Sequence, residues 1–540
     1  MGQACSFKKE INVKVLIIGI DGATWDVLDD LLLDRCMPNL KRLKSEGYSG
    51  VLQSTEPPIT PAAWTTCITG CLPPTHGIAG FREYSFKDDS ISIGNATGCL
   101  VPNIWQELST QGFKVVSINV PWTYPCQEIR GIMVAGHGSP GIFTYPNEFR
   151  EKLLHQIPDY DIVGRWDKAE NYTPAQLESI ITIVERSLEQ RLQVARLVTR
   201  EVDWSVMMVE FQDLDKLGHY MWPYIAKDMR DEYPLQRDRI FRMFNRLDQI
   251  MGDLLDLAAT DKLLVAMVSD HGMIHQTCDV MPNTFLYRWG YMRFQGLYRR
   301  LIRRLCLNVR SLSSAKSAPA HIELKGRIDW KRSKAAVIHT EISGYVYLNV
   351  KGRQPYGCVT PGKEYDDIVE DLRRRFSEVA CPVTGRPIFE RVATPAEIYH
   401  VEDIDAERFG DLILIPQPGY FLRSRMSEKS GYVEPLPAES LQGTHHPNGI
   451  FVFWGQAVKS AGNKRAHIAD IAPTLYAALG AKVPCYMNGK VLEDIFSQQI
   501  KIEYQRQGDQ SAAVPPKKKR LSATEEAVVA KRLAELGYLD

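Results

Sequence analysis

The chain has 540 residues, with 65 acidic and 65 basic side chains and therefore no formal net charge when histidine is neutral. This length exceeds what one simple domain usually holds, so we expect a main domain with an insertion or a second domain. The balanced charge provides no overall field for nucleic acid or an acidic membrane, so a nucleic-acid polymer is not an expected partner. The content of apolar and aromatic residues excludes wholesale disorder.

The first residues of the chain suggest a leader. Residues 1–12 are interpreted as flexible, and their start, MGQACS, fits the pattern for N-myristoylation at Gly2 with Cys5 as a second acyl site. Membrane contact is expected only if these two residues are acylated, and the alternative is a featureless leader. The lack of an apolar secretory core or membrane-length run, together with eleven scattered cysteines without CxxC pairs, favours the cytoplasm.

Residues 13–20 (VKVLIIGI) predict a strand buried on both faces of a parallel sheet, because the run is mostly apolar and β-branched. Asp21 and Gly22 follow at once. Open α/β sheets bind their ligands at the carboxyl ends of the strands, which makes Asp21 a candidate ligand. Taken alone, Asp21 could equally form a turn.

Two later runs repeat this pattern of a strand followed by acids. Residues 205–211 precede Asp213, Asp215 and His219, and residues 263–269 precede Asp270 and His271. Long helical patterns cover residues 174–199 and 234–259. This alternation predicts a doubly wound α/β fold with a mostly parallel central sheet flanked by helices.

Residues 60–70 (TPAAWTTCITG) predict one short helix. Thr60 is expected at the N-cap, Pro61 at the first helical position and Gly70 at the end. The backbone N–H groups of Ala62 and Ala63 would then favour an anion such as phosphate, and the Thr60 hydroxyl could act as a nucleophile. The alternative is that Thr60 only caps a surface helix.

The remaining chain suggests an interrupted core. Residues 13–280 are expected to form its first part and residues 402–500 its second, the latter including a strand at 411–416. Residues 281–401 are interpreted as an inserted cap region, whose basic stretch at 299–310 is either a solvated face or a means of attracting substrate. Residues 501–540 predict a polar linker and a last helix at 524–537.

The side chains that carry chemistry are a mixture of carboxylates and imidazoles around one hydroxyl. This mixture suits zinc, manganese or iron better than calcium or magnesium alone. The spacing of Asp215 and His219 can place both on one face of a helical turn. A single histidine is more often structural, but the whole set is difficult to explain that way. The candidates are Asp21, Thr60, Asp215, His219, Asp270, His271 and His445.

These motifs resemble the alkaline phosphatase superfamily, and specifically its type I phosphodiesterase and nucleotide pyrophosphatase branch. The resemblance is carried in chain order by Asp21-Gly22, residues 60–77, residues 215–219, residues 269–272 and residues 443–449. It covers about residues 13–496 and implies an alkaline-phosphatase-like core.

The resemblance also implies a two-metal site. One divalent metal ion would be held by Asp21, Thr60, Asp270 and His271, and the other by Asp215, His219 and His445, with the neighbouring His446 as an alternative to His445. Zinc is the first expectation and manganese the second, because the same ligands serve both.

The expected reaction is hydrolysis of a small phosphoric ester, with a diester favoured. Thr60 would attack phosphorus in line and form a phosphothreonyl intermediate, which water would then hydrolyse. The alternatives are a phosphomonoesterase, a phosphonate hydrolase or a phosphoryl-group transferase. Sulfatase activity is disfavoured, because the TPAAW block lacks the Cys-x-Pro-x-Arg pattern of sulfatases.

One position departs from the family pattern. Nucleotide pyrophosphatases have an asparagine shortly after the His-Gly pair that corresponds to His76-Gly77, whereas this chain has IAGFR at residues 78–82. Arg82 could contact the substrate instead, or it could face solvent. This departure weakens the expectation of nucleotide specificity.

Overall fold

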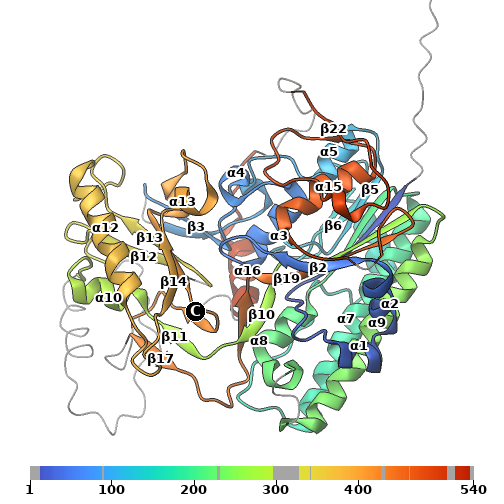
Figure 1. The fold of residues 1–540 in the computed structure, drawn as a ribbon, viewed down its shortest axis with the longest axis horizontal. Helices are drawn as coiled ribbons and strands as arrows, with labels where there is room; N and C mark the ends of the chain where they lie inside the picture. The colour runs from blue at the N-terminus through green and yellow to red at the C-terminus, as the bar shows by residue number, and fades with distance from the viewer. Residues whose placement is uncertain are drawn as a thin grey trace, which may run out of the picture.

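The computed structural model describes residues 13–87, 90–227, 232–295, 328–340, 342–426, 432–460, 462–506 and 517–535. These residues form a large lobe around a nine-stranded sheet and a smaller lobe around a four-stranded sheet (Figure 1). The expected leader at 1–12, with Gly2 and Cys5, and the basic stretch at 299–310 lie outside the described residues.

The central sheet is mostly parallel, as predicted. Only β19 and β7 run antiparallel to their neighbours, β19 beside β9 and β2, and β7 beside β6. The strand order across the sheet is β20 (Gly462–His467), β2 (Tyr48–Gln53), β19 (Asn448–Gly455), β9 (Leu263–Val268), β1 (Lys14–Ile20), β8 (Val206–Phe211), β5 (Val115–Ile118), β6 (Gly131–Val134) and β7 (Thr144–Tyr145).

Helices cover both faces of this sheet because the strands are apolar on both sides. In β1, Leu16 and Ile18 belong to the core under one helical layer, whereas Val15 and Ile17 belong to the core under the other. The first layer contains α1 (Asp30–Cys36), α2 (Pro38–Glu46), α7 (Pro174–Glu201) and α9 (Pro234–Ala258). The second contains α3 (Thr60–Thr69), α5 (Ile104–Thr110) and α15 (Ile471–Ala478).

The register of the three central strands brings their carboxyl ends to one edge. Ile20 of β1 pairs with Phe211 of β8, and Gly19 pairs with Val268 of β9. The acids that follow these strands therefore start from adjacent points. Helix α8 (Asp213–Ile225) begins at this edge, and α3 follows β2 nearby in the chain.

The smaller lobe has its own sheet and its own apolar core. Its antiparallel strands are, in order, β12 (Ala335–Thr340), β13 (Gly344–Leu348), β15 (Leu412–Pro416) and β14 (Phe389–Ala393). The same core includes residues of α10 (Pro282–Trp289) and α12 (Lys363–Glu378). A three-stranded sheet of β16 (Tyr420–Leu422), β11 (Cys278–Val280) and β17 (Val433–Pro435) adjoins it.

The expected boundary at residue 401 therefore needs correction. The strand predicted at 411–416 exists as β15, but it pairs with β13 and β14 rather than returning to the central sheet. A short apolar run fits either sheet, since its composition specifies a buried strand but not its neighbours. The chain rejoins the central sheet only at β19.

The expected last helix is present as α16 (Ala523–Glu535), which packs back on the large lobe. Val529 and Leu533 are buried in one apolar cluster with Ile59 and Ala62, the residues on either side of Thr60-Pro61. The Tyr220 hydroxyl of α8 donates to the carbonyl oxygen of Glu535. Helix α16 thus contacts helix α8 and shares an apolar cluster with the start of α3.

Among the described residues, none of the helices combines the length and the apolar character needed to cross a membrane.

Replacing Leu533 with alanine should loosen α16 from the large lobe. The Leu533 side chain is fully buried, so its truncation should cost about 2–5 kcal/mol of the free energy that holds the helix in place. Hydrogen exchange measured by mass spectrometry should show faster exchange across residues 523–535. Lys531→Ala, at a side chain that is 79% exposed, is the control, and equal exchange in the two variants would contradict the described packing.

Candidate functional site

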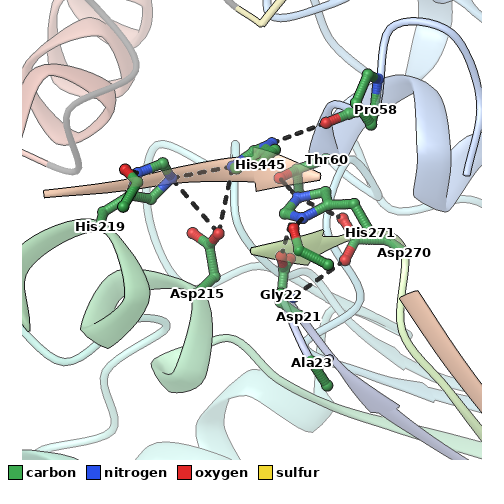
Figure 2. A network of polar contacts seen from close by, with 12 residues as sticks. Asp21, Gly22, Ala23, Pro58, Thr60, Asp215, His219, Asp270, His271 and His445 are labelled. Carbon is green, nitrogen blue, oxygen red and sulfur yellow. Dashed lines mark hydrogen bonds and ion pairs between the residues drawn. The ribbon is translucent and has the colours of Figure 1, made fainter. Parts of the chain in front are cut away.

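The sheet edge gathers the predicted ligands into two groups, each composed of two or more elements of the chain (Figure 2). The first group is Asp21, Asp270 and His271, and the second is Asp215, His219 and His445. Within each group the potential ligand atoms lie within 4.8 Å of one another. All six side chains are buried. The structure therefore brings together all six predicted carboxylate and imidazole ligands.

The first group lies at the ends of β1 and β9. His271 Nε2 is 3.5 Å from Asp21 Oδ1 and 3.2 Å from Asp270 Oδ2, and all three side chains have no exposed surface. Among the described residues, neither of these two carboxylate oxygens has a hydrogen-bond donor. Two buried, unsatisfied carboxylate oxygens beside one imidazole nitrogen form a donor set that suits a divalent cation.

The second group joins helix α8 to strand β18 (Gly443–His446). Asp215 Oδ1 is 3.5 Å from His219 Nε2 and 3.3 Å from His445 Nε2. Asp215 and His219 come from successive turns of α8, as their spacing predicted. His445 arrives from a strand more than 200 residues later in the chain.

The tautomers of the three histidines follow from their other ring nitrogens. Each Nδ1 lies 2.8–3.1 Å from a carbonyl oxygen: His271 from Gly272, His219 from Gly443 and His445 from Pro58. A carbonyl oxygen only accepts, so each Nδ1 carries the proton and each Nε2 of a neutral ring presents a lone pair to the site.

Two of these lone pairs face each other. His219 Nε2 and His445 Nε2 are only 2.9 Å apart, so a proton or another cation must lie between the rings or beside them. Burial lowers the pKa of His219 to about 4, which disfavours the proton at neutral pH. Burial likewise holds the pKa of His271 well below its usual range. The residues therefore fit metal ions, with nitrogen and oxygen donors typical of zinc or manganese sites.

The carboxylates also need a cation. Burial raises the pKa of Asp21 and of Asp270 well above the usual range, and the charge of Asp270 on Asp21, and of Asp215 on Asp270, adds to the rise. Burial acts on Asp215 in the same direction, but His219 and His445 outweigh it and hold its pKa below the usual range. A divalent cation would stabilise the ionised form of all three acids.

Thr60 lies next to the first group, with Oγ1 3.5 Å from His271 Nε2 and its side chain fully buried. It is not the N-cap that the sequence predicted. Ile59 is the N-cap and Thr60 the first helical residue, so the Ala63 N–H is not free but donates to the carbonyl oxygen of Ile59. The error is one residue, because proline is accepted at either of the first two positions. Gly70 ends the helix in the left-handed conformation, as expected (φ 66°).

Trp64 contacts the first group, which the sequence analysis did not predict. Its indole Nε1 donates to Asp21 Oδ2 at 3.0 Å, and both side chains are fully buried. The bond occupies one oxygen of Asp21 and leaves the other facing the site. The helical spacing of Thr60 and Trp64, four residues apart on one face, is the signal that could have indicated this contact.

His446 belongs to neither of the two groups. Adjacent residues of a strand point to opposite faces, and His446 Nδ1 accepts a hydrogen bond from the backbone N–H of Asn448 instead.

Arg82, in β3 (Arg82–Ser85), lies apart from the two groups. It lines a cavity of about 110 Å³ together with, among others, Glu83, Arg408 and Lys518, and none of the seven predicted metal ligands lines it.

Comparisons with known proteins show what the whole chain is similar to. The model of the type I phosphodiesterase/nucleotide pyrophosphatase family matches residues 15–448. The chain is similar to alkaline phosphatase PafA of Elizabethkingia meningoseptica, with 20% identity over 574 aligned residues that cover 89% of this chain and 94% of PafA. Among solved structures it resembles human ectonucleotide pyrophosphatase/phosphodiesterase 5, with a TM-score of 0.51 and 14% identity, covering 90% of this chain and 100% of the other. The structural likeness supports the shared α/β fold.

Trp64→Phe should destabilise the protein and weaken metal binding, because Asp21 Oδ2 loses its buried donor. The lost hydrogen bond should cost about 1–3 kcal/mol in the free energy of unfolding. The control is Trp105→Phe, since Trp105 is also fully buried in the same core and its indole nitrogen has no acceptor among the described residues. Denaturant unfolding and metal titration of both variants measure the difference, and equal losses would contradict the role of this bond.

His445→Ala should reduce affinity for zinc by at least about 100-fold, because loss of a direct ligand should exceed the 10–100-fold effect typical of losing a hydrogen-bond partner of a ligand. The neighbouring His446→Ala should bind zinc as the unmodified protein does. Metal content after dialysis and competition with a chelator measure the two affinities. A stronger loss in His446→Ala would reverse the assignment of the ligand.

Proposed function

The chain belongs to the type I phosphodiesterase/nucleotide pyrophosphatase family, and from this premise we propose that it hydrolyses phosphodiesters through Thr60 at a two-metal site. Membership of this family makes it a phosphoester hydrolase of the alkaline phosphatase superfamily. The diester preference, the threonine nucleophile and the count of two metals are our proposal.

The observation that carries the proposal is the position of the Thr60 hydroxyl. Thr60 Oγ1 lies 3.5 Å from His271 Nε2, and His271 in turn stacks on His445 of the second group, with 3.5 Å between the ring centroids. The hydroxyl is thus adjacent to one ligand group, and the other begins one ring away. This arrangement supports a nucleophile next to one cation and a leaving group or water next to the other.

In the proposed first step, Thr60 Oγ1 forms a bond to phosphorus while the bond from phosphorus to one alcohol oxygen breaks. The Thr60 proton leaves to solvent, and the departing alkoxide takes up a proton. In the second step, a water oxygen attacks phosphorus from the side opposite Thr60, the Thr60–phosphorus bond breaks, and the hydroxyl is restored. The product is a monoester with the second alcohol still attached.

The residues of the chain prepare this chemistry. The start of α3 would provide a positive dipole end beside the phosphoryl oxygens. Thr60 and the first group would hold one divalent cation, and Asp215, His219 and His445 the other. When bound, such cations lower the pKa of a threonine hydroxyl and of water and offset phosphoryl charge. Zinc is our first choice and manganese the second.

The second candidate is a phosphomonoesterase, which the similarity to a protein named alkaline phosphatase favours. A phosphonate hydrolase or a transferase, in which an alcohol replaces water in the second step, would use the same residues.

We also keep Arg82 as a proposed contact for the distal part of the substrate. Arg82→Ala should then raise KM while leaving kcat within about threefold.

The test compares bis(p-nitrophenyl) phosphate with p-nitrophenyl phosphate as substrates of zinc- or manganese-loaded protein. We expect faster diester cleavage, a loss of at least about 1,000-fold in Thr60→Ala and partial activity in Thr60→Ser, which keeps a hydroxyl. Rapid denaturation during turnover should leave a phosphoryl adduct on the peptide that contains Thr60, detectable by mass spectrometry.

Faster monoester cleavage would move the assignment to a phosphatase. Undiminished activity in Thr60→Ala would remove Thr60 as the nucleophile. Alcohol acceptors that appear in the product would indicate a transferase.

A further inference from the structure

The loop between β2 and α3, residues 54–59, contacts the site from one side. The Pro58 carbonyl oxygen accepts the Nδ1 proton of His445 at 2.8 Å, and the Ser54 N–H donates to the Pro447 carbonyl oxygen at 2.8 Å. Ile59 directly precedes Thr60 and caps its helix. The position of this loop therefore determines both the direction of the His445 ring and the start of the nucleophile helix.

The smaller lobe holds the same loop from the other side, at Glu56. The Ser343 hydroxyl, from the bend between β12 and β13, donates to Glu56 Oε1. The Tyr399 hydroxyl, from α13 (Pro395–Tyr399), donates to the Glu56 carbonyl oxygen. Ser343 and Tyr399 are both buried. One residue of the loop thus receives two buried hydroxyl donors from the smaller lobe.

Other contacts join the smaller lobe to the segment after α3 without touching the loop. The Tyr345 hydroxyl donates to the Ala79 carbonyl oxygen at 3.2 Å, and the Arg408 guanidinium donates to the carbonyl oxygens of Gly77 and Gly98. Loss of the contacts at Glu56 should therefore release the loop while the lobes remain joined.

We propose that Glu56 is a positioning residue through which the smaller lobe sets the loop that orients His445 and Thr60. The role of Thr60 in this inference rests on the proposed function, whereas the orientation of His445 does not. The chain of contacts runs from Ser343 and Tyr399 through Glu56 to Pro58, and from Pro58 to the second ligand group. A small displacement at Glu56 would thus reach both the metal ligand and the nucleophile.

The test compares Glu56→Ala, Glu56→Gln and Ser343→Ala. Glutamine keeps an oxygen that can accept the Ser343 proton, so Glu56→Gln should stay close to the unmodified protein. For Glu56→Ala and Ser343→Ala we expect kcat for bis(p-nitrophenyl) phosphate to fall about 10–100-fold with KM changed less than about threefold, because misplacement of a nucleophile affects the chemical step. Zinc affinity, measured by competition with a chromophoric chelator, should fall about tenfold as His445 loses its orienting contact.

A further test variant is Tyr399→Phe, and its matched control is Tyr291→Phe. Both remove one tyrosine hydroxyl of the smaller lobe, but the Tyr291 hydroxyl donates to Asp371 Oδ2 at 2.6 Å, within the same lobe. Tyr399→Phe should follow Ser343→Ala, and Tyr291→Phe should leave kcat and zinc affinity within about twofold.

Zinc affinity that is the same in Glu56→Ala, Ser343→Ala and Tyr291→Phe would overturn the inference, as would a Glu56→Gln protein as impaired as Glu56→Ala. If the unmodified protein turns over no diester, the proposed function fails, and the zinc affinities still decide the positioning of His445.

Discussion

The structure depends on one constraint: three parallel strands of one register end at the same edge, and an acid follows each of them. Asp21, Asp215 and Asp270 are consequently buried close together. Burial and neighbouring carboxylate charge raise the pKa of Asp21 and of Asp270, whereas His219 and His445 hold the pKa of Asp215 below its usual range. Hydrogen bonds from Trp64 and from the Gly22 backbone satisfy only part of this charge. Divalent cations would stabilise the remaining charge, for which the two groups of donor atoms are suited. The arrangement of the strands thus also determines the chemistry that the site can support.

The surrounding elements hold the side chains of the site in position. Backbone carbonyls fix the tautomer of every histidine in the site, which leaves no imidazole free to rotate. These carbonyl oxygens belong to Pro58, Gly272 and Gly443, which are far apart in the chain. The smaller lobe contacts the loop before Thr60 at Glu56, and α16 shares an apolar cluster with Ile59 of the same loop. The two supports meet at the loop before Thr60.

Much of this could be predicted from the sequence, because strands followed by acids leave a strong pattern. The mostly parallel sheet and the candidates Asp21, Asp215, His219, Asp270 and His271 follow from this pattern, whereas His445 precedes a strand and was a candidate through its residue type and the family resemblance. The choice between His445 and His446 could not be made, because a four-residue strand does not reveal which of its faces is turned inward. In the structure, β18 pairs with β10 (Gly272–His275), and it is His445 that lies beside Asp215 and His219. Likewise, the sequence of β15 predicts a buried strand but does not indicate which of the two sheets it joins, because this depends on its long-range partners.

The order of strands also has a consequence for synthesis of the chain. β2 pairs, within the described residues, only with β19 and β20, which are translated some 400 residues later. Until then β2, the strand that precedes Thr60, lacks its hydrogen-bonded partner strands, and the second group lacks His445. A nascent chain would thus carry an unpaired strand β2 and an incomplete set of candidate ligands. Chaperones could bind the unpaired strand until β19 and β20 emerge from the ribosome. The two groups of candidate ligands would be complete only after β18, β19 and β20 have been synthesised.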